Sequence, residues 1–398
     1  MSTPTFPSVA TQGLSADPLL DVLRRQAPTF RIKAPYGGEC WMVTRHEDVR
    51  AVQTDPRFSR RAMIGQDVAR TSPYPLQGES IVGMDPPDHT RIRRLVSMAF
   101  TARRVESLPQ RAQALVDGLL DEAAAADGPV DLVEGLAQPL PIAMICELLG
   151  VAYEDRSRFR GWANVFMTST AHPIEDVLTA RDHLFAYLAE LVASRRAQPT
   201  TDLLGALVLQ RDEGDALTED ELVNLAFSLL VGGFETTAAQ LAKSVLMLLL
   251  HPDQLALVRA DPELVPTAVE ELLRVIPLSS GTSLAWVATE DVVVGDVTIR
   301  AGDVLMASAA AANLDEAVFD QPERFDVTRS PNPHLSFGHG LHFCLGAHLA
   351  RMELQVAIGS LATRFPDLRL AVAPDDVPWK VGSAVWGLAA LPVLVSAV

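Results

Sequence analysis

The ten residues from Phe337 to Gly346 read FGHGLHFCLG. They place Cys344 two residues after His342, in a loop with three glycines, Gly338, Gly340 and Gly346. A thiolate is a strong, charged metal ligand, and backbone N–H groups aimed at the sulfur would stabilise that charge. A tight turn with open amides requires residues without a Cβ, which the glycines supply. The sequence therefore predicts a loop that presents a thiolate to a metal ion.

The residues after this loop, Ala347 to Phe365, have the apolar spacing of a helix. The thiolate would then lie just before a helix N-terminus, where the helix dipole favours negative charge. Phe337 would add an apolar wall beside a flat ligand. We interpret the other two cysteines, Cys40 and Cys146, as small buried apolar residues. Zinc is an alternative because four histidines lie nearby, but structural zinc sites prefer paired cysteines at short spacing.

The pattern FxxGxHxCxG, formed by Phe337, Gly340, His342, Cys344 and Gly346, resembles the haem-binding loop of the cytochromes P450. The resemblance extends over roughly Leu19 to Val395. It implies a mainly α fold with small β-sheets, in which haem b lies between a long central helix and the helix after the cysteine loop. Cys344 would be the axial iron ligand. We expect residues 1–16 to form a disordered tail and residues 17–398 to form a single domain of this fold.

Composition limits the classes of partner. The chain has 398 residues, 48% of them hydrophobic, and a net charge of −17, which argues against nucleic-acid binding and against an anionic membrane surface. Three cysteines without a pairing pattern indicate a reducing compartment. The N-terminus lacks a signal-peptide pattern, and the most apolar segment, Leu222 to Leu250, contains Glu235 and Lys243. We expect a soluble, cytoplasmic monomer.

A long helix is predicted from about Thr218 to Leu250, because Thr218 and Glu221 form a capping-box pattern and Pro252 follows the end. Its centre reads LLVGGFETTAAQ. Each interior glycine costs about 1 kcal/mol relative to alanine. Gly232 and Gly233 therefore suggest close approach by a flat group or a local opening of the helix. An acid beside an alcohol in an apolar helix, Glu235 and Thr236, can relay protons into a buried site.

The block GGFETT resembles the oxygen-activation motif of the P450 family, with Glu235 in the acid position and Thr236 in the alcohol position. The resemblance implies that both residues are catalytic and that Gly232, Gly233, Phe337 and Gly338 also line the haem. His89 and Arg93, four residues apart on a predicted helix, can together bind an anion. They resemble the pair that holds a haem propionate; the alternative is an exposed basic helix.

Two further segments resemble family motifs. Glu271 and Arg274 match a buried ExxR pair, and Arg324 in PERF matches its third member. The text from Leu284 to Leu305 predicts strands, with turns at Gly295 and Gly302. Many family members have an arginine that binds a propionate at the start of this segment, where this chain has Trp286. The indole N–H is one neutral donor, so this propionate would be held less firmly, held by another group, or turned elsewhere.

The resemblance implies a monooxygenase that activates O2 and hydroxylates or epoxidises a bulky, apolar natural-product intermediate in bacterial secondary metabolism, with electrons from a separate ferredoxin and its reductase. The predicted substrate pocket contains Ser228, Val231, Gly232, Thr282, Ser283 and Val385. One alternative is oxidative coupling of aromatic cyclodipeptides without oxygen insertion. Another, of a different class, is a non-catalytic haem or zinc protein.

Overall fold

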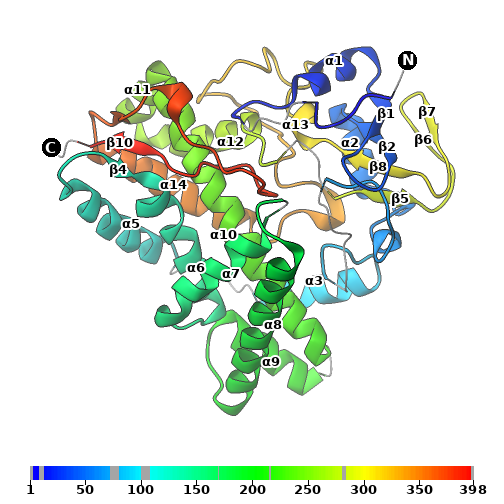
Figure 1. The fold of residues 1–398 in the computed structure, drawn as a ribbon, viewed down its shortest axis with the longest axis horizontal. Coiled ribbons are helices and arrows are strands. Elements are labelled where there is room, and N and C mark those ends of the chain that lie inside the picture. Colours follow the sequence, from blue (N-terminus) through cyan, green and yellow to red (C-terminus); the bar gives the residue numbers. More distant parts are fainter. Residues whose placement is uncertain are drawn as a thin grey trace. The chain divides into compact units, whose positions relative to one another are not determined.

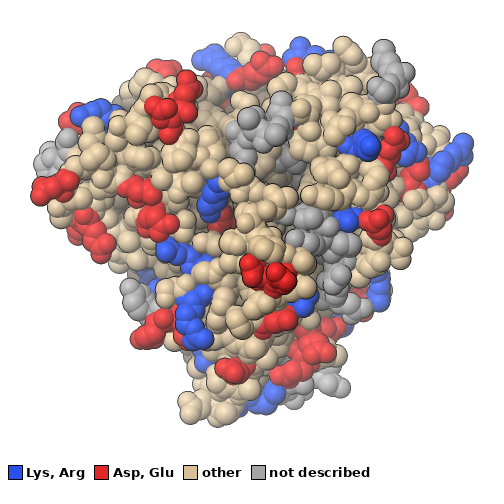
Figure 2. Space-filling model, in the orientation of Figure 1, with Lys and Arg blue, Asp and Glu red and all other residues tan. Residues whose placement is uncertain are grey.

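The computed structural model describes residues 3–8, 13–71, 80–99, 108–168, 170–214, 217–279 and 284–395. Contacts divide the chain into two compact units. The sheet unit comprises Met1–Pro86 and Thr267–Cys344, and the helical unit comprises Pro87–Pro266 and Leu345–Val398. Figure 1 labels the helices and strands of each unit. Figure 2 shows acidic and basic side chains interspersed over the visible face.

The helical unit is built around α10 (Glu219–Leu250), which packs against α6, α8 and α14. Its helices are α3 (Asp88–Ala99), α5 (Leu108–Ala124), α6 (Pro139–Leu149), α7 (Arg156–Phe166), α8 (Ile174–Ala197), α9 (Leu203–Gly214), α10, α11 (Pro252–Ala260) and α14 (Ala347–Arg364). A small sheet joins β4 (Val130–Asp131), β10 (Pro392–Leu394) and β9 (Arg369–Leu370). The predicted capping box is present: the Thr218 hydroxyl accepts from Glu221 N, and the Glu221 carboxylate accepts from Thr218 N.

Length and composition alone would allow α10 to cross a membrane, but 56% of its most apolar window is buried inside the protein. Glu235 and Lys243, the two charged residues of α10 beyond its first turn, are both buried. A core helix of a water-soluble protein has these properties, because its apolar surface is covered by neighbouring helices rather than by lipid.

The sheet unit contains a five-stranded sheet in the order β1-β2-β8-β5-β3. Its strands are β1 (Thr29–Lys33), β2 (Glu39–Val43), β3 (Phe58–Ser59), β5 (Trp286–Ala288) and β8 (Val304–Ala307). A separate hairpin joins β6 (Val292–Val294) and β7 (Val297–Ile299), and the unit's other helices are α1 (Pro18–Gln26), α2 (His46–Thr54), most of α12 (Val265–Val275) and α13 (Ala309–Ala312). The strands predicted between Leu284 and Leu305 are therefore confirmed.

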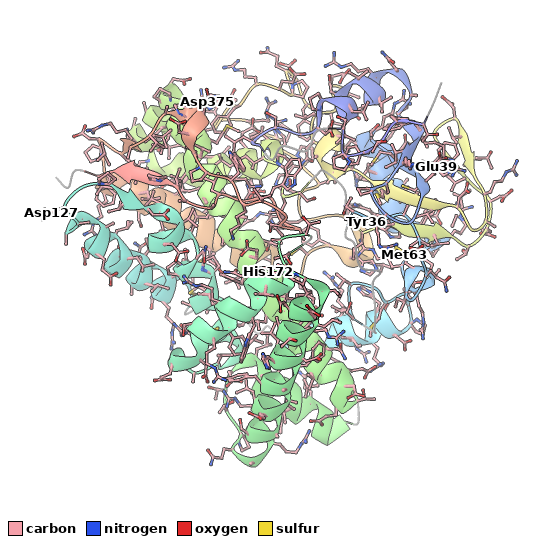
Figure 3. The ribbon with its side chains drawn as sticks, viewed as in Figure 1. Tyr36, Glu39, Met63, Asp127, His172 and Asp375 are labelled. Carbon is pink, nitrogen blue, oxygen red and sulfur yellow. The ribbon has the colours of Figure 1, made fainter. Side chains whose placement is uncertain are left out.

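The five-stranded sheet is apolar on both faces. Along β8, Leu305 and Ala307 enter one apolar cluster and Met306 enters the other, as the two-residue period of a strand requires. The turn between β1 and β2 lies between Tyr36 and Glu39 (Figure 3), and its two glycines both have positive φ. Covered faces make this sheet a rigid support for the loops at its ends.

The first described residues differ from the expected loose tail. Phe6 is fully buried, and its backbone N–H donates to the carbonyl of Lys33 at 3.0 Å. Lys33 in turn donates to the carbonyl of Pro4 at 2.8 Å. One large aromatic side chain in a core cluster and two backbone hydrogen bonds are enough to attach residues 3–8 to β1. Composition alone indicated a tail because proline, serine and threonine dominate the segment.

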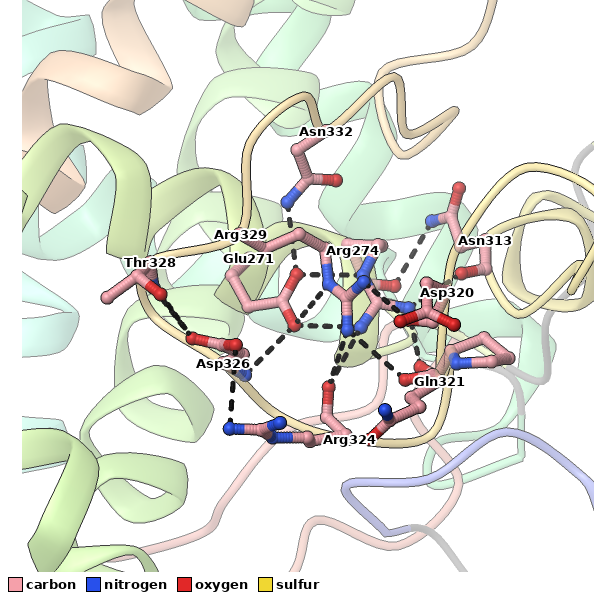
Figure 4. A network of polar contacts seen from close by, with 11 residues as sticks. Glu271, Arg274, Asn313, Asp320, Gln321, Arg324, Asp326, Thr328, Arg329 and Asn332 are labelled. Carbon is pink, nitrogen blue, oxygen red and sulfur yellow. Dashed lines mark hydrogen bonds and ion pairs between the residues drawn. The ribbon is translucent and has the colours of Figure 1, made fainter.

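A buried charge network holds the segment that precedes the cysteine loop (Figure 4). Glu271 and Arg274 are both fully buried and joined by two hydrogen bonds of 2.8 Å, which confirms the predicted pair. The third member is Arg329, whose Nε donates to Glu271 at 3.1 Å. Arg324, which we predicted for this role, has a 60% exposed side chain 3.8 Å from Asp326. That prediction was wrong.

The same network reaches the cysteine loop through Asn313. Its side-chain nitrogen donates to the carbonyl of Arg274 at 3.2 Å, and its side-chain oxygen accepts from Leu335 N at 2.7 Å. The Ser336 hydroxyl donates to the carbonyl of Leu273 at 2.6 Å. The residues immediately before Phe337 are therefore fixed to the end of α12.

Candidate functional site

The cysteine loop is a tight turn whose shape depends on two glycines. Gly338 and Gly340 have φ values of +72° and +67°, a region that L-residues rarely adopt. A Cβ on Gly340 would also lie 2.5 Å from the carbonyl oxygen of Gln53, at the end of α2. The Cys344 N–H donates to the Phe337 carbonyl at 2.9 Å. Gly346, by contrast, has a φ of −86°, so the conformational reason that we gave for a glycine there does not apply.

Burial separates the three cysteines. Cys40 and Cys146 are fully buried, and burial raises the pKa of each thiol to about 12. Cys344 is exposed and lies two residues before Gly346, the residue that caps the N-terminus of α14. A thiol near the N-terminus of a helix is the kind that ionises and binds a metal, whereas a buried apolar thiol is inert.

Helix α3 begins at Asp88, directly after Pro86 and Pro87, and it carries the predicted pair. His89 is buried (1% exposed), and Arg93 is half-buried on the same helix. Arg91 binds the carboxylate of Glu221 with both terminal nitrogens, which ties α3 to the first turn of α10. Burial alone would raise the pKa of Glu221, but the hydrogen bonds from Arg91 and Thr218 outweigh it and lower the pKa.

Helix α10 remains helical through its two glycines, so the local opening that we considered is not present. Gly233 has a packing reason, because a Cβ there would lie 3.0 Å from Cδ1 of Ile145 on α6. A Cβ on Gly232 would meet no described atom within 4 Å. Gly232 is exposed and Thr236 half-exposed, while Glu235 between them is buried. Because glycine has no side chain, a flat group can approach the backbone of α10 closely at Gly232.

The acid and alcohol of α10 have different partners. The Thr236 hydroxyl donates to the carbonyl of Gly232, one turn earlier, at 2.6 Å. Glu235 is 2% exposed and accepts from Lys380 Nζ at 2.6 Å, while its second oxygen, Oε2, is buried without a hydrogen bond in the described part of the chain. No motif in the sequence indicates this role for Lys380. Its backbone N–H donates to the carbonyl of Gly387 at 2.9 Å, and a Cβ on Gly387 would lie 3.3 Å from Cβ of Ala239 on α10.

The predicted substrate-pocket residues fall into three groups. Gly232 is exposed and Ser228 half-buried on α10, whereas Val231 and Val385 are buried. Thr282 and Ser283 lie outside the described residues.

Half-buried aromatic rings gather at α10: Phe227 of α10 stacks on Phe185 of α8 at 4.5 Å and meets Phe166 of α7 edge-on at 5.0 Å. The sequence analysis did not identify their contact with Phe227.

Trp286 is buried (3% exposed) on β5, and the Arg60 guanidinium lies over its ring, 4.5 Å from the centroid. The sequence analysis did not identify Arg60. In the part of the chain that the structure describes, no three histidine, cysteine or acidic side chains converge as they would around a metal ion. The zinc alternative therefore has no ligand set there, whereas a single exposed thiol suits a metal that brings its own nitrogen ligands.

Comparison with known proteins defines the class. The cytochrome P450 family model matches residues 20–382. The chain is 50% identical to nocardicin C N-oxygenase of Nocardia uniformis subsp. tsuyamanensis, over 98% of each chain. It is 45% identical to the mycinamicin IV hydroxylase/epoxidase of Micromonospora griseorubida, again over 98% of each. The crystal structure of the LnmA hydroxylase from the leinamycin pathway of Streptomyces atroolivaceus has a TM-score of 0.93 and 52% identity, covering 98% of this chain and 100% of that one.

These matches define an oxidoreductase that uses a haem held by a cysteine thiolate. The chain belongs to the cytochrome P450 family, within the bacterial monooxygenases of secondary metabolism. The predicted mainly helical fold with small sheets is confirmed. Enzymes of this class take small-molecule substrates, O2 and electrons from redox partner proteins.

Proposed function

We propose that Cys344 is the axial thiolate ligand of the haem iron. Its exposure, the open turn at Gly338 and Gly340, and its place before α14 support this assignment. The buried thiols of Cys40 and Cys146, whose pKa values are about 12, would remain protonated and out of reach. Phe337, His342 and Gly346 would complete the contacts of the loop with the haem.

We propose that α3 and α10 supply the remaining haem contacts. His89 and Arg93 share α3 and would bind one propionate. Gly232 leaves space beside α10 for the flat ring, and Gly233 lets α10 pack against α6. When bound, the haem supplies reductive activation of O2, in which one oxygen atom enters the substrate and the other leaves as water.

We propose that Glu235 and Thr236 deliver the protons that this reaction consumes. Thr236 holds its hydroxyl proton on the Gly232 carbonyl, so rotation of the side chain would free the hydroxyl for a water or for oxygen. Glu235 adjoins it and carries one carboxylate oxygen, Oε2, with no hydrogen bond among the described residues. Lys380 would hold this buried carboxylate in position, because it donates to the other oxygen.

We propose a bulky, largely apolar natural-product intermediate as the substrate, hydroxylated or epoxidised. The names of the relatives, which act on nocardicin C and mycinamicin IV, support this class, and so does the apolar cluster of Phe166, Phe185 and Phe227. Ser228, Val231 and Val385 remain proposed pocket residues. A ferredoxin and its reductase would supply electrons to a cytoplasmic monomer.

The first test is the carbon monoxide difference spectrum of the reduced protein. The expected Soret band lies at the wavelength that gives the family its name. Cys344→Ala should abolish that band, while the matched variant Cys146→Ala should retain it. A band at shorter wavelength in the unmodified protein, or an unchanged band in Cys344→Ala, contradicts the ligand assignment.

Product mass tests the reaction type. Incubation of a natural-product library with a ferredoxin, its reductase and NADPH should yield a product heavier by one oxygen atom, and ¹⁸O2 should label it. A product that has lost hydrogens without gaining oxygen would replace the monooxygenase proposal with oxidative coupling.

A further inference from the structure

Arg60 is a buried cation at the end of β3. Its side chain lies over the Trp286 ring, and the residue is 7% exposed. Nη1 donates to the carbonyl of Val82 at 3.1 Å. Nε is buried and has no hydrogen-bond partner in the described part of the chain. A buried guanidinium N–H that lacks an acceptor costs free energy, and a carboxylate bound at Arg60 would supply that acceptor.

The carboxylate of Asp85, which contacts the same segment, does not fill that position. Its Oδ1 accepts from the backbone N–H of Arg60 at 3.0 Å, and its Oδ2 accepts from the Ser59 hydroxyl at 2.5 Å. Asp85 thus fixes the backbone at Arg60 rather than pairing with the guanidinium. Burial lowers the pKa of Arg60 to about 10, so the side chain is still charged at neutral pH.

Trp286 determines how this charge is presented. The indole is buried in one apolar cluster with Val43, Leu305 and their neighbours, and this packing holds the ring in place. Contact with the indole ring covers one flat face of the guanidinium and orients it. The N–H groups at the edge of the guanidinium can then donate to a carboxylate that lies in the same plane. The haem of this family carries two propionate carboxylates, which are anions of the required shape.

We propose that Arg60, held by Trp286, binds a propionate carboxylate of the haem. The proposal rests on the proposed binding of haem at the Cys344 loop, and it adds a cofactor-binding residue that no sequence motif indicated. A carboxylate of the substrate is the other source of the same chemistry, and the experiment separates the two.

Arg31 provides a matched control in the same sheet. Its guanidinium lies 4.2 Å from the centroid of the Trp41 ring, which repeats the stacking geometry. Unlike Arg60, it is 39% exposed and donates to both carboxylate oxygens of Asp303 at 3.2 Å. Arg31 therefore has its anion within the protein and should have no effect on the cofactor.

The experiment measures the rate of haem transfer from the ferric holoenzyme to excess apomyoglobin. Arg60→Leu should lose haem about 10-fold faster or more, as expected for loss of a charge-assisted hydrogen bond. Arg31→Leu should stay within about twofold of the unmodified protein. The double variant Arg60→Leu, Trp286→Arg should recover slow transfer, because an arginine in the sheet is restored near the same place. The carbon monoxide band, recorded on each sample, tests the thiolate ligand separately.

Reconstitution with haem dimethyl ester distinguishes binding from a structural role. Esterification removes the propionate charges, so Arg60→Leu should not accelerate transfer of the ester. Equal acceleration of haem b and its ester would overturn the proposal, as would haem b transfer within twofold of the unmodified rate. Weaker binding of a carboxylate-bearing substrate with unchanged haem transfer would assign the carboxylate to the substrate and also overturn it. If Arg60→Leu does not fold, Arg60→Gln, which also removes the charge, decides by the same two haems.

Discussion

The buried charge network predicts that substitutions of Arg329 and Arg324 have very different effects on the stability of the protein. Arg329→Leu removes the Nε contact with Glu271 and three hydrogen bonds to backbone carbonyls, at 2.7, 3.1 and 3.1 Å. Removing one partner of a buried ion pair costs about 3–5 kcal/mol. Glu271 would keep both bonds from Arg274, so the lower end, about 3 kcal/mol, applies.

Arg324→Leu is the matched control. Its guanidinium is 60% exposed and lies 3.8 Å from Asp326, a contact worth about 0–1 kcal/mol. Thermal unfolding of the two haem-loaded variants at equal haem content measures the difference. Because a chain of 398 residues has a large entropy of unfolding, the Tm should fall by about 3–4 °C for Arg329→Leu and by about 1 °C or less for Arg324→Leu. A larger fall for Arg324→Leu would refute the identification of Arg329 as the third member of the network.

Three further predictions concern single sites. Gly340→Ala should lower the free energy of unfolding by about 2–4 kcal/mol, because Gly340 has a positive φ and a Cβ there would clash with α2. The haem content of the purified variant should fall as well. Gly118→Ala is the control, because a Cβ on Gly118 would meet open space. Burial raises the pKa of Glu353 well above its usual value, so the unfolding free energy should fall as pH rises above about 4.5, and Glu353→Gln should remove that slope in urea unfolding at several pH values. Lys380→Met should lower the free energy of unfolding by about 1–3 kcal/mol and lower the product yield per NADPH, because Glu235 loses its cation. Lys380→Arg keeps a cation and should retain the stability and the yield of the unmodified protein.

Several elements could be predicted from local sequence patterns alone. The capping box at Thr218 and the pair of Glu271 with Arg274 each involve residues three apart in the sequence, so the spacing alone brings them together. The hairpin before α2 follows from two glycines between strand-forming segments. In each case the interacting residues are close in the sequence, and their geometry follows from a single element.

Contacts between distant segments were not predictable in this way. Lys380 meets Glu235 across 145 residues, and nothing near either residue indicates the other. Arg60 reaches Trp286 because β3 pairs with β5, a register that depends on the whole sheet. Arg324 and Arg329 lie in the same irregular segment, and which of them turns inward depends on the carbonyls that surround Glu271.

Glu221 makes two interactions, and together they couple the ordering of two helices. Its carboxylate closes the first turn of α10 and also binds Arg91 of α3, the helix that carries His89 and Arg93. Any ligand that orders α3 therefore also orders the start of α10, and by linkage each event raises the equilibrium constant of the other by the same factor. Amide exchange in the first turn of α10 should then slow when α3 binds its proposed ligand, the haem, and this turn would become an internal reporter of cofactor loading.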